Sequence, residues 1–127
     1  MFQIDAMSRQ PVYEQLVEQI ERFVLTGILG PGDQLPSVRS LSVELSINPN
    51  TIQKAYTELD TKGIIYSIPG IGCFVAENAK EVLSVLTRRK LTEFKALAKE
   101  LALAGVSLEE LKGAATTAYY ERGVKND

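Results

Sequence analysis

The stretch from Asn48 to Tyr56, NPNTIQKAY, predicts a short helix with two chemically different sides. Asparagine is a favoured N-cap and proline suits the first helical position, so the helix is expected to begin at Pro49. It should continue to about Lys62, because Gly63 is suited to a left-handed position just beyond a helix. The apolar residues at helical spacing predict the buried side: Ile52, Ala55, Tyr56 and Leu59.

The opposite side of this helix is polar. Successive steps of about 100° place Asn50, Lys54 and Thr57 there, with Thr51 and Gln53 beside them. Asparagine and glutamine can bind adenine edges, threonine can contact the thymine methyl group, and lysine can reach guanine or phosphate. Any solvated surface helix also has a polar outer face, so this pattern alone leaves both interpretations open.

The residues before this helix predict a partner helix. Residues 11–26 form an amphipathic pattern that predicts a first helix, with Pro11 at its first helical position, followed by the loop GILGPGDQLPS. Leu29 and Leu35 should anchor that loop in the core. Residues 38–46 predict a second, short helix with Ser37 as its N-cap. Two short helices joined by the tight turn SIN therefore predict a helix-turn-helix pair.

The residues after it predict a β-hairpin. The run IIYSIPGIGCFVA, residues 64–76, is rich in β-branched and aromatic residues around a glycine-containing turn, which predicts strands at residues 64–67 and 72–76. A hairpin directly after a helix-turn-helix pair forms a wing. The expected fold is therefore mainly α with a small β-hairpin, a winged helix-turn-helix over residues 1–77 followed by a helical tail.

That tail, residues 78–127, predicts two helices, the first ending at Gly105 and the second beginning after Ser107. About fifty residues in two helices do not easily enclose a core of their own, so their apolar stripes need a partner surface. A second copy of the chain would supply it, which predicts a dimerisation tail. The alternative is that the helices fold back on their own winged domain.

Composition makes several functions improbable. The chain has 127 residues with 45% hydrophobic content, as in soluble globular proteins, and no apolar run predicts a signal peptide or a membrane span, so a cytoplasmic protein is expected. Histidine is absent, which removes the commonest general base and metal ligand. Cys73, the single cysteine, is expected to be a small strand residue, with redox sensing as a minor alternative. Neither an enzyme, nor a metal site, nor a cofactor is expected.

Charge is distributed unevenly along the chain. The net charge is −2, but residues 1–77 hold five basic and nine acidic residues, whereas residues 78–127 hold nine and seven. Any DNA contact must therefore use a local patch of cations. The candidates for that patch are Arg39, Lys54, Arg9 and Lys62. Because so few cations predict weak binding by one subunit, doubling the patch by twofold symmetry favours a dimer.

Two runs of the chain, GPGDQLPSVRSLSVEL and NPNTIQKAYTELDTKGIIYSIPGIGCFV, resemble the GntR family of bacterial transcription regulators. The resemblance covers about residues 11–77, and the loop, both helices and the wing come in the family's order. The short helical tail is similar to that of the YtrA-like branch, whose members lack a full effector domain. The resemblance implies a homodimeric repressor that binds near-palindromic double-stranded operator DNA and dimerises through its C-terminal helices.

The resemblance also implies which residues of the helix pair contact DNA. Arg39 matches the arginine that reaches DNA from the first helix of the pair, while Ser37 would cap that helix and donate to phosphate. Thr51 and Gln53 fall at contact positions of the recognition helix, with Asn50 beside them. Many relatives outside the branch carry arginine at the position of Pro49 and often arginine or lysine at that of Gln53, so this chain has fewer cations and its base preference is open.

In the wing, Gly70 and Gly72 match glycines whose backbone approaches the minor groove in the family. Both could instead serve only the turn geometry, since glycine permits positive φ. Arg39 could merely pair with Glu44 or Asp60, and Lys54 could be an ordinary solvated lysine. Two competing functions also remain: a protein-interaction module on the same fold, and a regulator gated by a small-molecule effector, for which the sequence specifies no pocket.

Overall fold

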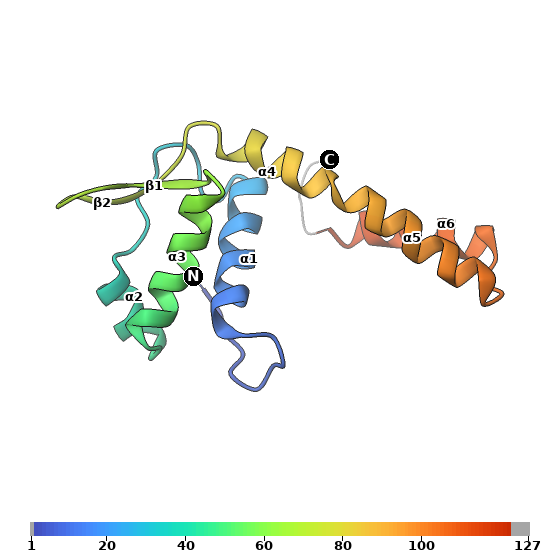
Figure 1. Ribbon diagram of the computed structural model, residues 1–127, viewed down its shortest axis with the longest axis horizontal. Helices are drawn as coiled ribbons and strands as arrows, with labels where there is room; N and C mark the ends of the chain where they lie inside the picture. Colours follow the sequence, from blue (N-terminus) through green and yellow to red (C-terminus); the bar gives the residue numbers. More distant parts are fainter. Residues whose placement is uncertain (1, 123–127) are drawn as a thin grey trace. The chain divides into compact units, whose positions relative to one another are not determined.

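The computed structural model describes residues 2–122, and the chain divides into two compact units. The first unit ends at Val85 and the second begins at Leu86. Figure 1 labels the elements, which are, in order, α1 (Val12–Leu25), α2 (Val38–Leu45), α3 (Pro49–Thr61), β1 (Ile65–Ile68), β2 (Gly72–Val75), α4 (Ala79–Arg88), α5 (Lys90–Leu103) and α6 (Leu108–Tyr120). The predicted class is confirmed: a mainly helical chain with one two-stranded antiparallel sheet.

Helix α3 lies at the centre of the first unit, where it packs against α1, α2 and β1. The largest fully buried side chains come from the three helices, from the residue before β1 and from β2: Leu16, Ile20, Leu41, Ile52, Leu59, Ile64 and Val75. Burying one such side chain stabilises a fold by about 1.5–3 kcal/mol relative to leaving it exposed. The apolar side of α3 is thus fixed inward, and its polar side is left facing outward.

The predicted N-caps of α2 and α3 are confirmed by their hydrogen bonds. The Ser37 hydroxyl accepts from the Ser40 backbone N–H at 3.0 Å, and the Asn48 side chain accepts from the Asn50 N–H at 2.8 Å. Each bond satisfies an N–H that has no partner within its helix. At α1 the prediction was wrong by one residue, because Pro11 is the N-cap itself, with extended backbone at ψ 145°.

The end of α3 is fixed by glycine as the sequence predicts. Gly63 has φ +82°, and the next residue, Ile64, donates its N–H to the carbonyl of Leu59 at 3.0 Å. This is the Schellman arrangement, in which a left-handed residue lets the chain turn back over the last helical turn. The buried side chains of Ile64 and Leu59 accompany it, so the chain leaves α3 in position to start the wing.

The wing consists of two strands and a short segment before α2 that pairs with one of them. In the hairpin Ile65 lies opposite Val75 and Ile68 lies opposite Gly72. The hairpin thus begins at Ile65, one residue later than the sequence predicts, and ends at Val75, one residue earlier. The loop before α2 pairs with the outer edge of β2. There Gln34 forms an isolated bridge with Phe74, so the wing is attached to the segment that leads into α2.

Two polar side chains attach the N-terminal segment to α1. Gln15, which is buried, accepts from the Asp5 N–H and donates to the carbonyls of Asp5 and Gln10 at 2.9–3.0 Å. Gln19 exchanges hydrogen bonds with the backbone of Gln3. The polar pattern of α1 gives no sign of these contacts, because each partner lies in a segment without periodicity.

The first part of the tail differs from the prediction. Ala79 and Leu83, one helical turn apart on α4, are buried in the core of the first unit. The compact unit that contains the wing ends at Val85, and the domain boundary at residue 77 stays a prediction. The single helix expected up to Gly105 is also interrupted, since α4 ends at Arg88 and α5 begins at Lys90.

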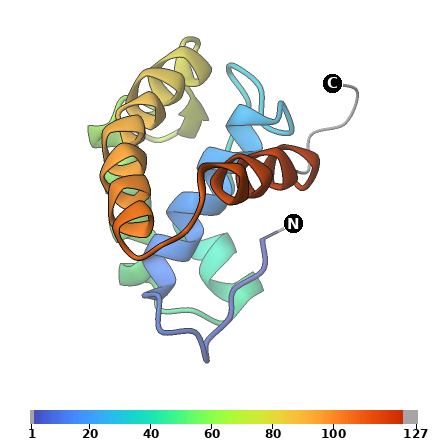
Figure 2. The same cartoon turned by 90° about the vertical axis from the view of Figure 1, so that its right-hand side faces the viewer.

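The second unit contains α5 and α6, joined at a glycine as predicted. Gly105 has φ +98°, and the Val106 N–H donates to the Leu101 carbonyl at 3.0 Å. The Ser107 hydroxyl then caps α6 by accepting from the Glu110 N–H at 3.1 Å. After this turn α6 runs away from α5 (Figure 2), and neither helix has a buried residue.

Candidate nucleic-acid interface

The turn between α2 and α3 and a hydrogen bond across the helix pair hold the two helices together. Ser46 ends α2 in the left-handed conformation at φ 55°, which allows the chain to reverse within three residues. Across the pair, the Tyr56 hydroxyl donates to the Pro36 carbonyl at 2.7 Å. Burial is the main cause that raises the pKa of Tyr56 well above its ordinary value, and an electrostatic contribution from Cys73 adds to it, so the phenol stays a donor over a wider pH range than a solvated tyrosine.

The outward side of α3 carries the side chains that the sequence selects. Asn50, Gln53, Lys54 and Thr57 are exposed, whereas Thr51 is half-buried. The Gln53 amide donates to the Thr57 hydroxyl one turn later at 3.2 Å. Two groups that can read base edges are thus already oriented toward each other on one stripe of the helix.

Lys54 is not an ordinary solvated lysine. Its Nζ lies 4.0 Å from the centre of the Tyr13 ring, which belongs to α1. A cation over an aromatic face is attracted by the ring's electron density, by about 0.5–1 kcal/mol at exposed sites. Tyr13 therefore restricts where the Lys54 ammonium can go, and it keeps the charge beside the outward face of α3.

Arg39 and Ser37 stand at the start of α2. Arg39 is exposed, and within the described chain no ion pair joins it to Glu44 or Asp60, the two carboxylates that the sequence offered as partners. Ser37 is exposed as well, and its oxygen is engaged as the cap acceptor while its hydroxyl proton remains able to donate. Both groups are available to an anion next to the N-terminus of α2.

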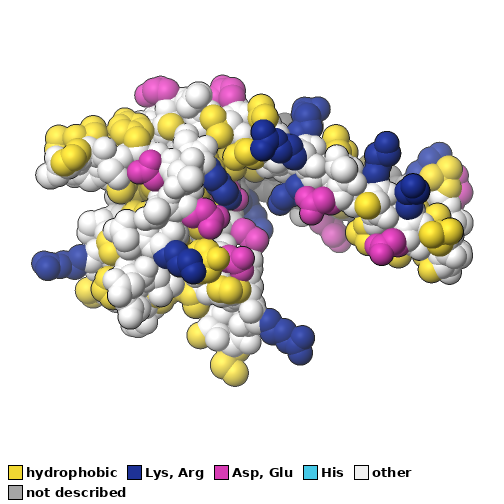
Figure 3. Space-filling view, viewed as in Figure 1, with side chains coloured by type: hydrophobic (Ala, Val, Ile, Leu, Met, Phe, Trp, Pro, Cys, Tyr) yellow, Lys and Arg dark blue, Asp and Glu magenta, His cyan; other side chains and the backbone are white. Residues whose placement is uncertain are grey.

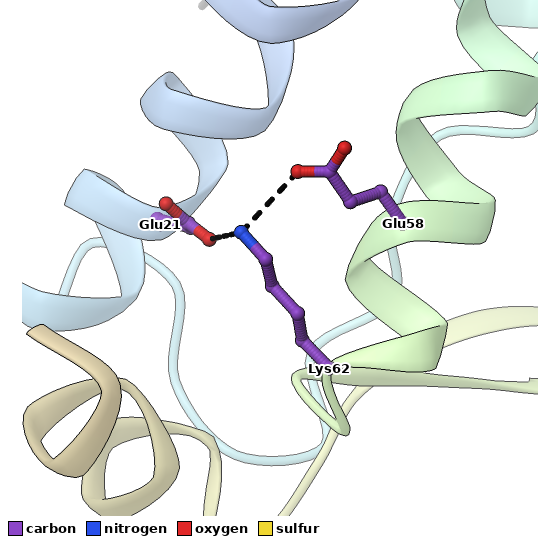
Figure 4. A network of polar contacts seen from close by, with 3 residues as sticks. All are labelled: Glu21, Glu58 and Lys62. Atoms are coloured by element: carbon purple, nitrogen blue, oxygen red, sulfur yellow. Dashed lines mark hydrogen bonds and ion pairs between the residues drawn. The ribbon is translucent and has the colours of Figure 1, made fainter.

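Lys62, a further candidate cation in the sequence, is already paired. Its ammonium lies 2.9 Å from Glu21 on α1 and 3.2 Å from Glu58 on α3 (Figure 4). Burial alone would lower the pKa of Lys62, but the hydrogen bonds and charges of the two glutamates outweigh this and raise it. Lys62 therefore joins α1 to α3, and its charge is already neutralised.

Backbone geometry requires both wing glycines. Gly70 has φ +78° and Gly72 has φ +146°, conformations that L side chains rarely adopt. At Gly72 a Cβ atom would also lie 2.6 Å from the side-chain nitrogen of Gln34, so that amide would have to move. Their structural role is thus established by geometry, whereas contact with DNA remains a prediction.

Among residues 2–122 there is no group of three or more His, Cys, Asp or Glu residues that could hold a metal ion. In the same part of the chain, no helix combines the length and the apolar character that crossing a membrane requires.

Comparison with known proteins places the chain in a family. Residues 12–75 match the family described as bacterial regulatory proteins, gntR family. The chain belongs to the GntR family. It is 45% identical, over 87% of its length and 86% of the relative's, to the HTH-type transcriptional repressor YtrA of Bacillus subtilis (strain 168).

Solved structures of GntR-like proteins agree with the fold. A transcriptional regulator from Oenococcus oeni is 36% identical with a TM-score of 0.72, and the match covers 94% of this chain and 99% of that one. The DNA-binding domain of AraR, solved in complex with operator ORX1, is 32% identical with a TM-score of 0.52, covering 60% of this chain and 93% of that one. This GntR-family chain is thus a DNA-binding transcription regulator and not an enzyme.

Sequence reasoning missed two residues that position the interface of this GntR-family chain. The half-buried ring of Tyr13 packs against the core and also supports the Lys54 ammonium. Gln34 was assigned to a loop, but it pairs with β2 and donates from its side chain to the Ile71 carbonyl at 3.1 Å. Neither contact has a sequence pattern, since each joins residues far apart in the chain.

Proposed function

We propose that this chain is a repressor that binds a near-palindromic operator as a homodimer, through the winged unit, and that α5 and α6 form the dimer contact. Its place of action would be the cytoplasm, where a bacterial regulator meets DNA. The observation that carries the proposal is the capped α2–turn–α3 pair, whose central helix has one side in the core and an exposed polar stripe on the other.

The DNA contacts in this proposal follow from chemistry and placement. The exposed stripe of α3 offers Asn50 and Gln53 for base edges, with the half-buried Thr51 beside them. Phosphates would be bound at the flanks by charge and by hydroxyl or backbone N–H groups. We assign this positioning role to Ser37, Arg39, Lys54, Gly70 and Gly72.

The dimer follows from the tail and from the small number of cations. Leu91, Phe94 and Leu97 recur at helical spacing on α5 and are more than half exposed, which is costly in water. With Lys62 neutralised, Arg39 and Lys54 are the main cations of the proposed contact surface in each subunit. A twofold pair would double that charge and place two α3 helices on half-sites about 34 Å apart, or a multiple of that distance.

The first experiment is a fluorescence titration of the protein against the DNA upstream of its own gene, with a scrambled duplex for comparison and several salt concentrations. We expect Arg39→Ala to weaken operator binding at least about tenfold and to reduce the salt dependence by about one phosphate contact per subunit. Arg22→Ala is the matched control, because Arg22 is an exposed arginine on α1 outside the proposed interface.

Each outcome of the titration has a definite meaning. Tight, salt-sensitive binding of one dimer per upstream site would support an autoregulating repressor. Equal losses for Arg39→Ala and Arg22→Ala would remove Arg39 from the proposed interface. Salt-insensitive binding, or none to either duplex, would favour a protein-interaction module on the same fold.

A further inference from the structure

A cavity of about 320 Å³ lies in the first unit, where the end of α1, the loop after it, the end of β2 and the start of α4 meet. Its floor consists of core side chains that are each less than one-tenth exposed: Val24, Leu29, Val75 and Ala79. Sites for small molecules in proteins have volumes of about 300–1,000 Å³ and are lined mainly by apolar groups. The cavity thus has the size and the apolar floor that a small organic molecule requires.

Hydrogen bonds hold the loop side of the cavity against β2. The Gly32 N–H donates to the Val75 carbonyl and the Val75 N–H donates to the Asp33 carbonyl, each at 2.8 Å. The Asp33 carboxylate accepts from the Gly30 N–H, also at 2.8 Å, which closes the loop on itself. The loop side of the cavity is therefore set by backbone geometry and not only by exposed side chains.

Charged side chains line the mouth of the cavity. Glu77 precedes α4, Lys80 and Glu81 belong to its first turn, and all three are exposed. Within residues 2–122 none of them forms an ion pair or a side-chain hydrogen bond. The Glu77 carboxylate reaches the loop side, because a Cβ atom added at Gly32 would lie 3.6 Å from its Oε1. In Figure 3 acidic side chains lie along the upper edge of the molecule, near the place where the chain passes from β2 into α4.

The charges at the mouth indicate the class of ligand that this cavity suits. Two carboxylates and one ammonium give a net charge of −1, and neither carboxylate has a partner in the described chain. A complementary ligand carries a positive group beside an apolar body. In an alkylamine or arylamine the hydrocarbon would cover the apolar floor, and the ammonium would lie beside the carboxylates.

We propose that this cavity binds a small amine with an apolar body, and that its occupation changes the affinity of the winged unit for operator DNA. The second part rests on the proposed operator binding, whereas the first does not. The loop on one side leads to Ser37, the cap of α2, and α4 on the other side continues past the end of the first unit at Val85. A ligand that contacts both sides stabilises the arrangement that it fits best, and it shifts operator affinity by that difference.

The first test measures amine binding without DNA. In a nuclear magnetic resonance titration, 2-phenylethylamine, a cation at neutral pH, should shift the backbone amide signals of the residues around the cavity. The uncharged 2-phenylethanol has nearly the same shape and should bind about three- to fivefold more weakly, as expected for the loss of an exposed ion pair. Phenylalanine should also bind more weakly than the amine, because its carboxylate would meet the two glutamates.

Variants of the mouth separate the effect of charge from that of shape. Glu77→Gln and Glu81→Gln should each weaken amine binding about three- to fivefold and leave binding of the alcohol unchanged, since glutamine keeps the size of glutamate without its charge. Lys80→Gln should strengthen amine binding, because it removes a repulsive cation. Glu110→Gln is the matched control, since Glu110 lies in the first turn of α6 as Glu81 lies in that of α4.

The second test repeats the operator titration with 2-phenylethylamine at about ten times its Kd. We expect the operator affinity of the wild type to change at least about threefold, and that of Glu77→Gln to change less. Ammonium chloride at the same concentration is the control for ionic strength, because DNA binding itself depends on salt. Linkage requires that operator DNA change the Kd of the amine by the same factor.

Four results would overturn parts of this inference. No amide shift around the cavity with any of the three compounds would exclude the site. Equal binding of amine and alcohol, equal losses in Glu77→Gln and Glu110→Gln, or tighter binding of phenylalanine would exclude an amine as its ligand. Amine binding with unchanged operator affinity would exclude the regulatory role. Amine binding by a protein that binds neither duplex would support the site and contradict the proposed operator binding instead.

Discussion

At the scale of single residues, Tyr56 links packing, hydrogen bonding and protonation. It is 2% exposed, and its hydroxyl donates to the Pro36 carbonyl across the helix pair. Because burial raises its pKa, the folded chain keeps the proton in a pH range where the unfolded chain, with an ordinary pKa of about 10, releases it. Its contribution to the free energy of unfolding is therefore complete below pH 10 and is lost as the pH rises further.

The corresponding prediction concerns Tyr56→Phe. At neutral pH the variant should lose about 1 kcal/mol of the free energy of unfolding, because the Pro36 carbonyl loses its donor. Between pH 10 and 12 the difference from wild type should shrink, since phenylalanine does not ionise. Urea denaturation at several pH values measures this, and a constant difference would show that Tyr56 ionises equally in both states.

At the scale of elements, Gly63 decides how α3 passes into the wing. Gly63→Ala should lower the free energy of unfolding by about 1–2 kcal/mol, the cost of a left-handed backbone for an L residue. Steric overlap adds nothing, because no atom lies within 4 Å of the added Cβ. Thermal denaturation would measure the loss, and Gly63→Asn should lose less because asparagine tolerates this conformation.

Gly113→Ala is a control that should change the free energy of unfolding in the opposite direction to Gly63→Ala. Gly113 lies inside α6, has no neighbour within 4 Å of an added Cβ and does not have positive φ, so alanine there should favour the helix by about 1 kcal/mol. Destabilisation of equal size by Gly63→Ala and Gly113→Ala would contradict the argument from backbone conformation.

The same elements show what sequence reasoning can reach. Ser37, Asn48 and Gly105 act on backbone groups within a few residues, so helix starts and stops follow from local chemistry. By contrast, the bond from Gln34 to Ile71 spans 37 residues and that from Lys62 to Glu21 spans 41. The local pattern of the sequence predicts the fold and the outward polar stripe of α3. The contact that positions the wing, and the ion pairs that neutralise Lys62, depend instead on tertiary packing.

At the scale of the whole molecule, the proposed dimer contact depends on the exposed apolar residues of α5. On α5, Phe94 is 55% exposed and lies between Leu91 and Leu97, within about 60° of each around the helix. Leu103 is 90% exposed but lies about 180° from Phe94, on the opposite side of the helix. Substitutions at these two positions can therefore show whether one particular face of α5 forms the contact or whether any exposed apolar residue of the helix has the same effect.

Phe94→Glu should therefore convert the proposed dimer to a monomer, because a charge cannot be buried in an apolar contact without a partner. Operator affinity should fall by about a hundredfold or more, since two linked winged units bind far more tightly than one. Leu103→Glu should leave both properties unchanged. Analytical ultracentrifugation and the operator titration measure them together. A dimer that persists in Phe94→Glu, or one that is lost equally in both variants, would rule out this face of α5 as the subunit contact.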